Sequence, residues 1–302
     1  MSTSVIISEQ VAESKSRAVA LESAVIATGL PFPKNLEAAF GCEEVIAAAG
    51  GVPATIAVLE GIPTIGCSKE QIKNLAQTPG VKKTNLSNLA AVVAERCYGA
   101  TTVSATMHLA TSVGIKVFST GGIGGVHKDA EVTFDISADL TALTRYPMVV
   151  VCAGAKSILD LPRTVELLET LGIPIVGYCS DRFPAFYSRD SGIKLDIVAE
   201  TPREVANIAK THWELGLNTA ILVALPIPQD HEIPQKEVNK LLSQALDDAN
   251  QQGIRGKALT PFLLSRLKEL SSGKTLEANL LLLKNNARLA AEIAVCLSEV
   301  HC

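Results

Sequence analysis

The sequence predicts a three-layer α/β/α fold with a mostly parallel central sheet and a helical C-terminal portion. Short apolar runs rich in β-branched residues alternate with longer segments of helical pattern along the chain. The run from Met148 to Cys152 is apolar throughout, which is typical of a strand covered on both faces. Hydrophobic residues make up 47% of the chain but aromatic residues only 4%, so Ala, Val, Leu and Ile build the core, as suits helices packed on a parallel sheet.

Glycine and capping residues divide the first part of the chain into elements. Gly50 and Gly51 end the first long helical pattern, and Ser68 is placed to cap another helix. The expected elements are an apolar segment over 18–26, helices over 33–49, 69–75, 89–98 and 103–114, and strands over 55–59, 64–66 and 115–118.

The remainder continues the alternation after a glycine-rich turn. A helix over 161–171 joins two apolar strands, which predicts a strand–helix–strand unit. The expected strands are 148–153, 173–178 and 220–225, and the expected helices are 137–143, 161–171, 202–215, 235–251, 261–270 and 276–300.

Length and composition limit the class of protein. With 302 residues and no clear linker or internal repeat, we expect one domain over 1–302. The net charge of −4 without a strong basic cluster argues against nucleic acid as a partner, and no apolar run is long enough to predict a membrane span. Seven scattered cysteines without CxxC spacing favour neither zinc nor disulfides, and the first residues do not resemble a secretory signal. We therefore expect a cytoplasmic protein.

Lys156 is the strongest candidate for a catalytic side chain. It follows the strand expected at 148–153, and Ala153-Gly154-Ala155 leaves little side-chain bulk beside it. Open α/β sheets bind ligands at the carboxyl ends of their strands, so Lys156 lies where an active site is expected. A partly desolvated amine there could attack a carbonyl or sugar carbon. A lone loop lysine is usually a solvated surface residue, but these surroundings favour the catalytic interpretation.

Thr120 begins a glycine-rich turn, Thr120-Gly121-Gly122-Ile123-Gly124-Gly125-Val126-His127. The turn matches neither a Walker A loop nor a dinucleotide-binding fingerprint. Its backbone N–H groups could approach an anion closely, although a tight strand-to-helix connection explains the glycines equally well. His127 is accordingly either an ordinary loop histidine or an anion contact.

Asp135, Ser137 and Asp139 form an acidic cluster. Asp139 follows Asp135 by four residues, so both carboxylates could share one helical face; alternatively Asp135 or Ser137 caps the helix. Two carboxylates and a hydroxyl could bind a hard cation such as Mg²⁺ or Mn²⁺, or supply a general acid or base.

Three other polar positions have both a structural and a functional interpretation. Glu22 lies in an apolar segment, where an acid is costly unless it is paired or functional; the alternative interpretation is an ordinary charge at a strand edge. Lys83 belongs to a lysine pair that is expected to be solvated in a loop, unless the protein binds a phosphate group there. Asn279 lies on the last helix, where its amide faces either solvent or a ligand.

These strings together resemble the pseudouridine-5′-phosphate glycosidase family, which includes the indigoidine-cluster protein A type. The resemblance runs in family order from about Ala20 to the C-terminal helix. Matching stretches include Gly51-Val52-Pro53-Ala54-Thr55, Thr120 to His127, Phe134 to Leu140, Val151-Cys152-Ala153-Gly154-Ala155-Lys156-Ser157-Ile158-Leu159-Asp160, Phe183-Pro184-Ala185-Phe186-Tyr187 and Asn285-Asn286-Ala287.

The resemblance implies reversible cleavage of the C–C glycosidic bond of pseudouridine 5′-phosphate, giving uracil and ribose 5-phosphate through a covalent lysine adduct of the ring-opened sugar. It implies that Lys156 is the nucleophile, Glu22 the proton donor and Asp135 the ligand of a divalent cation, usually Mn²⁺, in a homotrimer. It also implies a set of substrate-binding residues at this site. These candidates are Lys83, Val103, Thr120, His127, Ser137, Ala138, Asp139 and Asn279.

The chain departs from the family pattern after Lys83, where Thr84-Asn85-Leu86 replaces the expected charged residues, and at Leu225-Pro226, where an asparagine is expected. Either Glu22 or Asp139 could protonate the ring oxygen. Rival functions are another Schiff-base sugar-phosphate lyase or aldolase, a pyridoxal phosphate enzyme, and a non-catalytic phosphosugar-binding protein.

Overall fold

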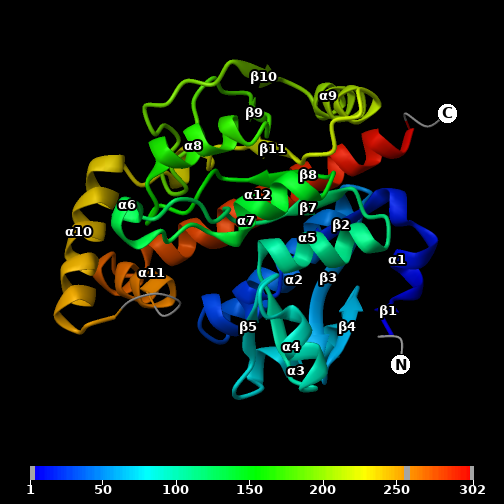
Figure 1. The fold of residues 1–302 in the computed structure, drawn as a ribbon, viewed down its shortest axis with the longest axis horizontal. Helices are drawn as coiled ribbons and strands as arrows, with labels where there is room; N and C mark the ends of the chain where they lie inside the picture. Colours follow the sequence, from blue (N-terminus) through cyan, green and yellow to red (C-terminus); the bar gives the residue numbers. More distant parts are fainter. Residues whose placement is uncertain (1–3, 255–258, 300–302) are drawn as a thin grey trace.

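Helices cover both faces of one sheet in the computed structural model, which describes residues 4–254 and 259–299 (Figure 1). Within these residues the sheet has 11 strands in the order β1-β4-β3-β2-β7-β8-β11-β9-β10, with β6 paired to β3 and β5 to β6. The strands are β1 (Ile6–Ile7), β2 (Ala18–Leu21), β3 (Val52–Leu59), β4 (Ile62–Ile65), β5 (Lys82–Thr84), β6 (Gly99–Thr101), β7 (Val117–Ser119), β8 (Val149–Cys152), β9 (Ile175–Tyr178), β10 (Ile197–Ala199) and β11 (Ile221–Ala224).

The sheet is mostly parallel, as the sequence predicts. All pairings from β3 through β2, β7, β8, β11 and β9 to β10 are parallel, and β3 pairs antiparallel with β4 and β6. All four residues of β8 are fully buried, which explains their unbroken apolar pattern. The three-layer α/β/α class is therefore confirmed.

The helices that connect the strands are divided between the two faces of the sheet. One face carries the long α12, which packs on α2 and α9, while α5 and α7 pack together on the other. The helices are α1 (Glu9–Glu13), α2 (Lys34–Ala48), α3 (Lys69–Gln77), α4 (Leu89–Ala94), α5 (Val103–Ser112), α6 (Ala130–Thr133), α7 (Ala138–Arg145), α8 (Leu161–Thr170), α9 (Pro202–Glu214), α10 (Gln235–Gln251), α11 (Leu259–Leu270) and α12 (Lys274–Glu299), with short helical turns η1 (Lys15–Arg17), η2 (Val25–Gly29) and η3 (Gln229–His231).

Local sequence signals explain several of these boundaries. Ser68 caps α3 as predicted, because its hydroxyl accepts the N–H of Gln71 while the Gln71 side chain accepts the N–H of Ser68. Asp160 caps α8 by accepting the N–H of Arg163, and Pro162 is the second residue of its first turn.

Other boundaries differ from the predictions. The helix expected over 89–98 ends at Ala94, since Arg96 has a φ of 54° and the chain then enters β6. The apolar segment over 18–26 is β2 followed by η2, a π-helical turn. The short elements β1, β5, β6, β10, α1 and α6 carry too little hydrophobic periodicity to be predicted. Residue 300 of the last predicted helix lies outside the described residues.

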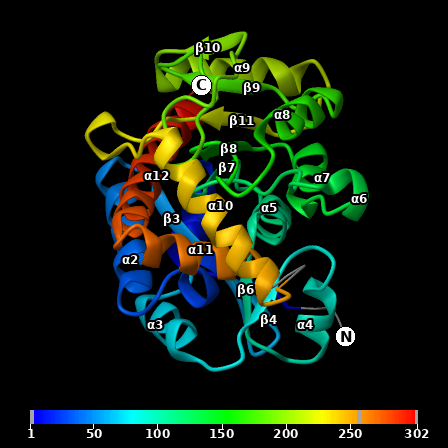
Figure 2. The same cartoon turned by 90° about the vertical axis from the view of Figure 1, so that its left-hand side faces the viewer.

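A crevice forms where β2 and β7 lie side by side. The chain leaves β2 for α2 on one face of the sheet and leaves β7 for α6 and α7 on the other, so the two connections diverge at the carboxyl ends of neighbouring strands. Such switch points are where open α/β sheets bind ligands. Figure 2 looks onto this edge, which α10 and α11 partly cover.

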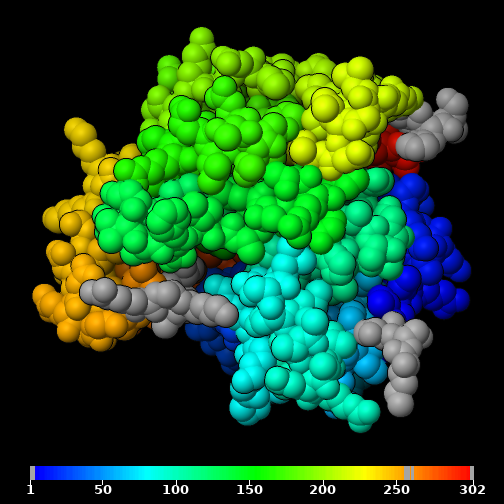
Figure 3. Space-filling model, viewed as in Figure 1, coloured from blue at the N-terminus to red at the C-terminus, as the bar shows by residue number. Residues whose placement is uncertain are grey.

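On the face shown in Figure 3, β4, α3, β5 and α4 (cyan) form a bulge below the green segment that contains α6 and α7. β5 belongs to this bulge and brings Lys83 into the pocket at the switch point. None of the helices in residues 4–254 and 259–299 is long and apolar enough to cross a membrane.

Candidate active site

A pocket of about 80 Å³, open to solvent, lies at the carboxyl edge of the sheet. Its walls come from the segments that follow β2, β7 and β8, from β5, and from α11 and α12. The lining residues are Glu22, Ala24, Val25, Thr28, Gly29, Lys83, Thr102, Gly121, Gly122, Lys156, Phe186, Leu264, Asn279 and Leu283. The two residues expected to carry the chemistry, Lys156 and Glu22, therefore share one pocket.

Glu22 follows β2 and points across the crevice toward the end of β7. Thr120, which is 1% exposed, donates its hydroxyl to Glu22 Oε1 at 2.5 Å. Desolvation raises the pKa of Glu22, against the opposing effects of the Lys156 charge and the Thr120 hydrogen bond. A carboxyl group with a raised pKa keeps its proton at higher pH and is suited to donate it.

Lys156 is half-buried and follows β8 after a sharp change of chain direction. Gly154 has a φ of 82°, and a Cβ there would lie 2.4 Å from the Pro184 carbonyl oxygen, so glycine is required. The Lys156 N–H donates to the carbonyl of Ile123, which ties its backbone to the glycine-rich turn. The Lys156 carbonyl in turn accepts the N–H of Leu159, so the backbone of the nucleophile candidate is held through both its N–H and its carbonyl group.

Lys83 lines the pocket from β5, although much of the residue is exposed. Desolvation lowers the pKa of Lys83, and so does the Lys156 charge, while Glu22 and Asp139 act in the opposite direction. The Lys83 backbone is held by the side chain of Asn88, which donates to its carbonyl at 3.0 Å. Two amine side chains and a carboxyl group therefore face one cavity.

Close packing explains the glycines of the turn after β7. A Cβ on Gly122 would lie 2.7 Å from the Phe186 ring, one on Gly124 would lie 2.2 Å from Ser137 Oγ, and one on Gly125 would lie 2.5 Å from Thr164. The N–H of Ile123 donates to the Gly154 carbonyl, and that of Gly124 donates to Asp139 Oδ2. Because these two N–H groups are bonded within the protein, fewer groups of the turn face a ligand than the glycine content suggests.

Asp139 has a different environment from the other candidate residues. It is 5% exposed, and its carboxylate accepts the backbone N–H of Ser104 at 3.1 Å and that of Gly124 at 2.9 Å. It therefore joins the first turn of α5 to the glycine-rich turn and stands behind the pocket lining. A direct substrate contact for Asp139 stays a prediction.

Ser137, Ala138 and Val103 lie at helix N-termini. Ser137 caps α7 by accepting the N–H of Asp139, which confirms the capping interpretation, and Ala138 begins the helix. Val103 begins α5, but its side chain is fully buried in the core, so any ligand contact would use its backbone. Asp135 precedes α7, and consequently the two acids do not share a helical face.

Asp135 and His127 lie at the outer side of this region. His127 Nδ1 is 3.9 Å from Asp135 Oδ2, and burial lowers the pKa of His127 despite the neighbouring carboxylate. Among the described residues, no group of three or more His, Cys, Asp or Glu side chains could hold a metal ion. One exposed carboxylate fits a cation that keeps most of its waters and shares substrate oxygens, as Mg²⁺ and Mn²⁺ often do, but not a closed protein site.

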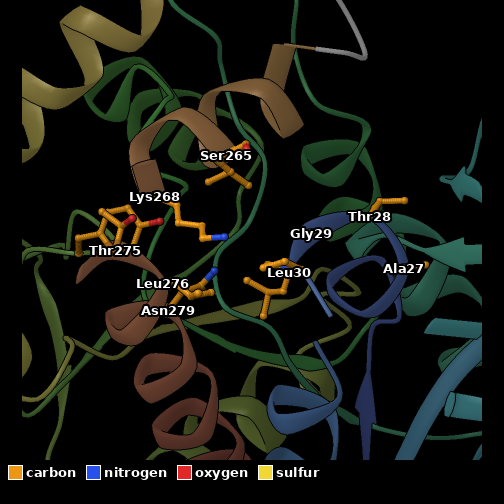
Figure 4. A pocket seen from close by; sticks show the side chains of 12 residues that line it. Ala27, Thr28, Gly29, Leu30, Ser265, Lys268, Thr275, Leu276 and Asn279 are labelled. Carbon is orange, nitrogen blue, oxygen red and sulfur yellow. The ribbon is translucent and has the colours of Figure 1, made fainter. Parts of the chain in front are cut away.

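A second cavity of about 250 Å³ adjoins the pocket and shares Thr28, Gly29, Leu264 and Asn279 with it. Figure 4 shows Lys268 of α11 and Asn279 of α12 extending toward each other in this outer cavity. Asn279 Oδ1 also lies 3.5 Å from where a Cβ of Gly121 would be. Asn279 thus lines both cavities, and a contact of its amide with a ligand stays a prediction.

Sequence reasoning missed three residues around the pocket: Thr102, Phe186 and Asn286. Phe186 has a φ of 64°, an unfavourable conformation for a bulky residue that marks functional sites more often than others. The Phe183-Pro184-Ala185-Phe186-Tyr187 string could have drawn attention to it. Asn286 belongs to the matching Asn285-Asn286-Ala287 stretch, but its place behind the pocket, like the place of Thr102 in the lining, depends on contacts distant in sequence.

Comparison with known proteins gives a consistent result over nearly the whole chain. The family model for indigoidine synthase A-like proteins matches residues 7–296. A protein of Caldanaerobacter subterraneus named pseudouridine-5′-phosphate glycosidase is 49% identical over 96% of this chain and 94% of its own. One of Geobacillus kaustophilus with the same name is 46% identical over 97% of this chain and 99% of its own.

Solved structures agree in fold. The prealnumycin C-glycosynthase AlnA, in complex with ribulose 5-phosphate, superposes with a TM-score of 0.91 at 35% identity over 100% of this chain and 99% of that one. An indigoidine synthase A-like protein of Thermotoga maritima gives a TM-score of 0.88 at 38% identity, covering 97% of each chain. This chain therefore belongs to the indigoidine synthase A-like family.

Proposed function

We propose that this protein reversibly cleaves the C–C glycosidic bond of pseudouridine 5′-phosphate, releasing uracil and ribose 5-phosphate. The observation that carries the proposal is that Lys156 and Glu22 line one pocket at the switch point of the sheet. Relatives at 46–49% identity bear the name of this activity, and the C-glycosynthase neighbour handles the same class of bond beside a sugar phosphate.

The chemistry explains the need for an acid and an amine. Glu22 in its protonated form donates to the ribose ring oxygen as the C1′–O4′ bond breaks and the sugar opens. The unprotonated amine of Lys156 then bonds to C1′. Its nitrogen lone pair next forms a C=N bond as the C1′–C5 bond breaks, and C5 takes a proton, so that uracil leaves intact. Water hydrolyses the iminium, which returns the amine and releases ribose 5-phosphate.

Geometry supports Glu22 over Asp139 as the proton donor. Glu22 lines the pocket, and its raised pKa favours the protonated form. Both oxygens of Asp139 accept backbone N–H groups, and Asp139 is not among the lining residues. Lys83 would hold the phosphate, so that binding energy at the far end of the substrate orients the reacting carbon.

Asp135 would hold the divalent cation, with His127 beside it. When bound, such a cation neutralises phosphate and hydroxyl charge on the substrate. The homotrimer stays a prediction that sedimentation equilibrium of the purified chain can test.

The direct test incubates the protein with pseudouridine 5′-phosphate, with and without Mn²⁺, and follows free uracil by chromatography. Release of equal amounts of uracil and ribose 5-phosphate is expected. An aldol substrate that is cleaved while pseudouridine 5′-phosphate is untouched would instead support the aldolase alternative.

Reduction with borohydride during turnover tests the lysine adduct. A mass increase of one ribose 5-phosphate unit, less one oxygen, is expected on the peptide that contains Lys156. The Lys156→Ala variant should fold and bind substrate but release no uracil. Binding without any adduct or turnover in the unmodified protein would support the non-catalytic alternative.

A further inference from the structure

We propose that Asn286 is a positioning residue for the reaction proposed above: its amide fixes the Thr120–Gly121 peptide so that the Thr120 hydroxyl meets Glu22. The inference rests on the proposed function for its kinetic consequences. Its structural part, the control of Glu22 through Thr120, can be tested without any substrate.

Asn286 reaches the site from α12, far along the chain from β7. It is fully buried, and its Nδ2 donates to the Thr120 carbonyl at 2.8 Å and lies 3.4 Å from the Gly121 carbonyl. Asn279 and Leu283, on the same side of α12, line the pocket. Asn286 thus contacts the pocket wall from behind.

The backbone around Thr120 is bonded to β8 and to Asn286: the Thr120 N–H donates to the Val151 carbonyl and the Ala153 N–H donates to the Gly121 carbonyl, while Asn286 supplies the donor to the Thr120 carbonyl between them. The two residues after Thr120 are glycines, which restrict the backbone less than any other residue type. Fixing the Thr120 carbonyl fixes the peptide plane and thereby the direction of the Thr120 side chain. That side chain makes the hydrogen bond to Glu22, so the amide sets the environment of the acid through two successive contacts.

The other half of the amide argues against a purely structural role. Within the described residues, Asn286 Oδ1 is buried and has no hydrogen-bond partner. An unpaired buried acceptor destabilises the fold, so volume alone would favour leucine at this position. The advantage of an amide at this position is therefore the hydrogen bond that its N–H group donates to the Thr120 carbonyl.

The test compares Asn286→Leu with Asn285→Leu, which makes the same chemical change at the adjacent, less buried position. Asn286→Leu should fold, lose about tenfold or more in kcat and change KM little, because positioning of the acid is disturbed while the phosphate contacts remain. Asn285→Leu should keep the kcat of the unmodified protein. Equal kcat in all three proteins would overturn the proposal.

A pH profile separates positioning from general damage. The Thr120 hydrogen bond lowers the pKa of Glu22, so disturbing it should move the alkaline limb of kcat to higher pH in Asn286→Leu. Thr120→Val should move the limb in the same direction, and the double variant should be no worse than the more damaged single variant. Fully additive losses, or an unmoved limb, would contradict the relay through Thr120.

Carboxyl-carbon NMR of ligand-free protein gives a readout that needs no activity. With the Glu22 resonance assigned by its loss in Glu22→Gln, its midpoint should be higher in Asn286→Leu than in Asn285→Leu. An identical midpoint overturns the proposal even if pseudouridine 5′-phosphate is not the substrate. Should Asn286→Leu fail to fold, Asn286→Ser undergoes the same titration.

Discussion

Asp139 Oδ2 accepts the backbone N–H of Gly124 at 2.9 Å. Asp139 Oδ1 accepts the backbone N–H of Ser104, the second residue of α5. One side chain thus joins the glycine-rich turn after β7 to a helix that starts beside the pocket. A Cβ on Gly124 would approach Asp139 Oδ2 to 2.8 Å, so the absence of a side chain at position 124 permits this contact. Asp139 therefore fixes the position of the glycine-rich turn relative to the first turn of α5.

Asp139→Asn should therefore lower the free energy of unfolding by about 1–3 kcal/mol, because the amide group would leave one buried N–H without an acceptor. Urea unfolding at neutral pH measures the loss. The matched control is Asp135→Asn, whose more exposed side chain should change stability by less than about 0.5 kcal/mol. Equal losses of unfolding free energy in the two variants would show that the Asp139 hydrogen bonds add no particular stability.

Glu22→Gln should make stability depend less on pH. Burial raises the pKa of Glu22 above its usual value of 4.5, so the folded state binds the proton more tightly than the unfolded state. The stability contributed by the protonated carboxyl is fully present below about pH 4.5 and is lost as pH rises through the folded pKa. Glutamine has no proton to lose and can still accept from Thr120.

Urea titrations at several pH values from 4 to about 8 should therefore show Glu22→Gln gaining stability relative to the unmodified protein as pH rises. The comparison variant is Glu44→Gln, an exposed position on α2. A stability difference between the two proteins that stays constant, or that shifts in favour of the unmodified protein as pH rises, would contradict the sign of this pKa shift.

Lys83→Met should reduce kcat/KM for pseudouridine 5′-phosphate by about 10- to 100-fold, because it removes a charge-assisted contact to the phosphate. Lys82→Met is the matched control, since neighbouring residues of β5 project to opposite faces of the strand. Competition by ribose 5-phosphate should weaken in Lys83→Met alone. If Lys82→Met is the more damaging change, the phosphate lies on the other side of β5.

Much of the fold could be predicted because its signals are local. The buried strands β8 and β11 are continuous apolar runs, and Ser68 caps α3 through residues three positions apart. The rule that ligands bind at carboxyl ends of parallel strands was enough to place Lys156 in a pocket.

The site beyond Lys156 was less accessible to sequence reasoning. Asp139 has backbone N–H partners, which leave no pattern in the sequence, so its two hydrogen bonds could not be anticipated. Asn286 lies 166 residues from Thr120, and only the packing of α12 on the sheet brings them together. β5 is three residues long with two lysines, too short and too polar to be recognised as a strand.

Gly122→Ala should damage the pocket more than Gly121→Ala, although the two substitutions are chemically identical and adjacent. A Cβ on Gly122 would lie 2.7 Å from two carbons of the Phe186 ring and 3.0 Å from the Gly154 carbonyl oxygen. The Phe186 N–H donates to the Ala153 carbonyl, so its backbone cannot retreat without breaking that bond. A Cβ on Gly121 would instead meet flexible leucine side chains at 3.2 and 3.3 Å.

Overpacking at Gly122 should therefore cost about 1–3 kcal/mol of stability and lower kcat, since the ring that moves lines the pocket beside Lys156. Gly121→Ala should lose less than half as much in urea unfolding. The double variant Gly122→Ala with Phe186→Leu, which shortens the opposing side chain, should recover stability without recovering kcat. Recovery of both would mean that the ring only fills space, and recovery of neither would place the strain at Gly154.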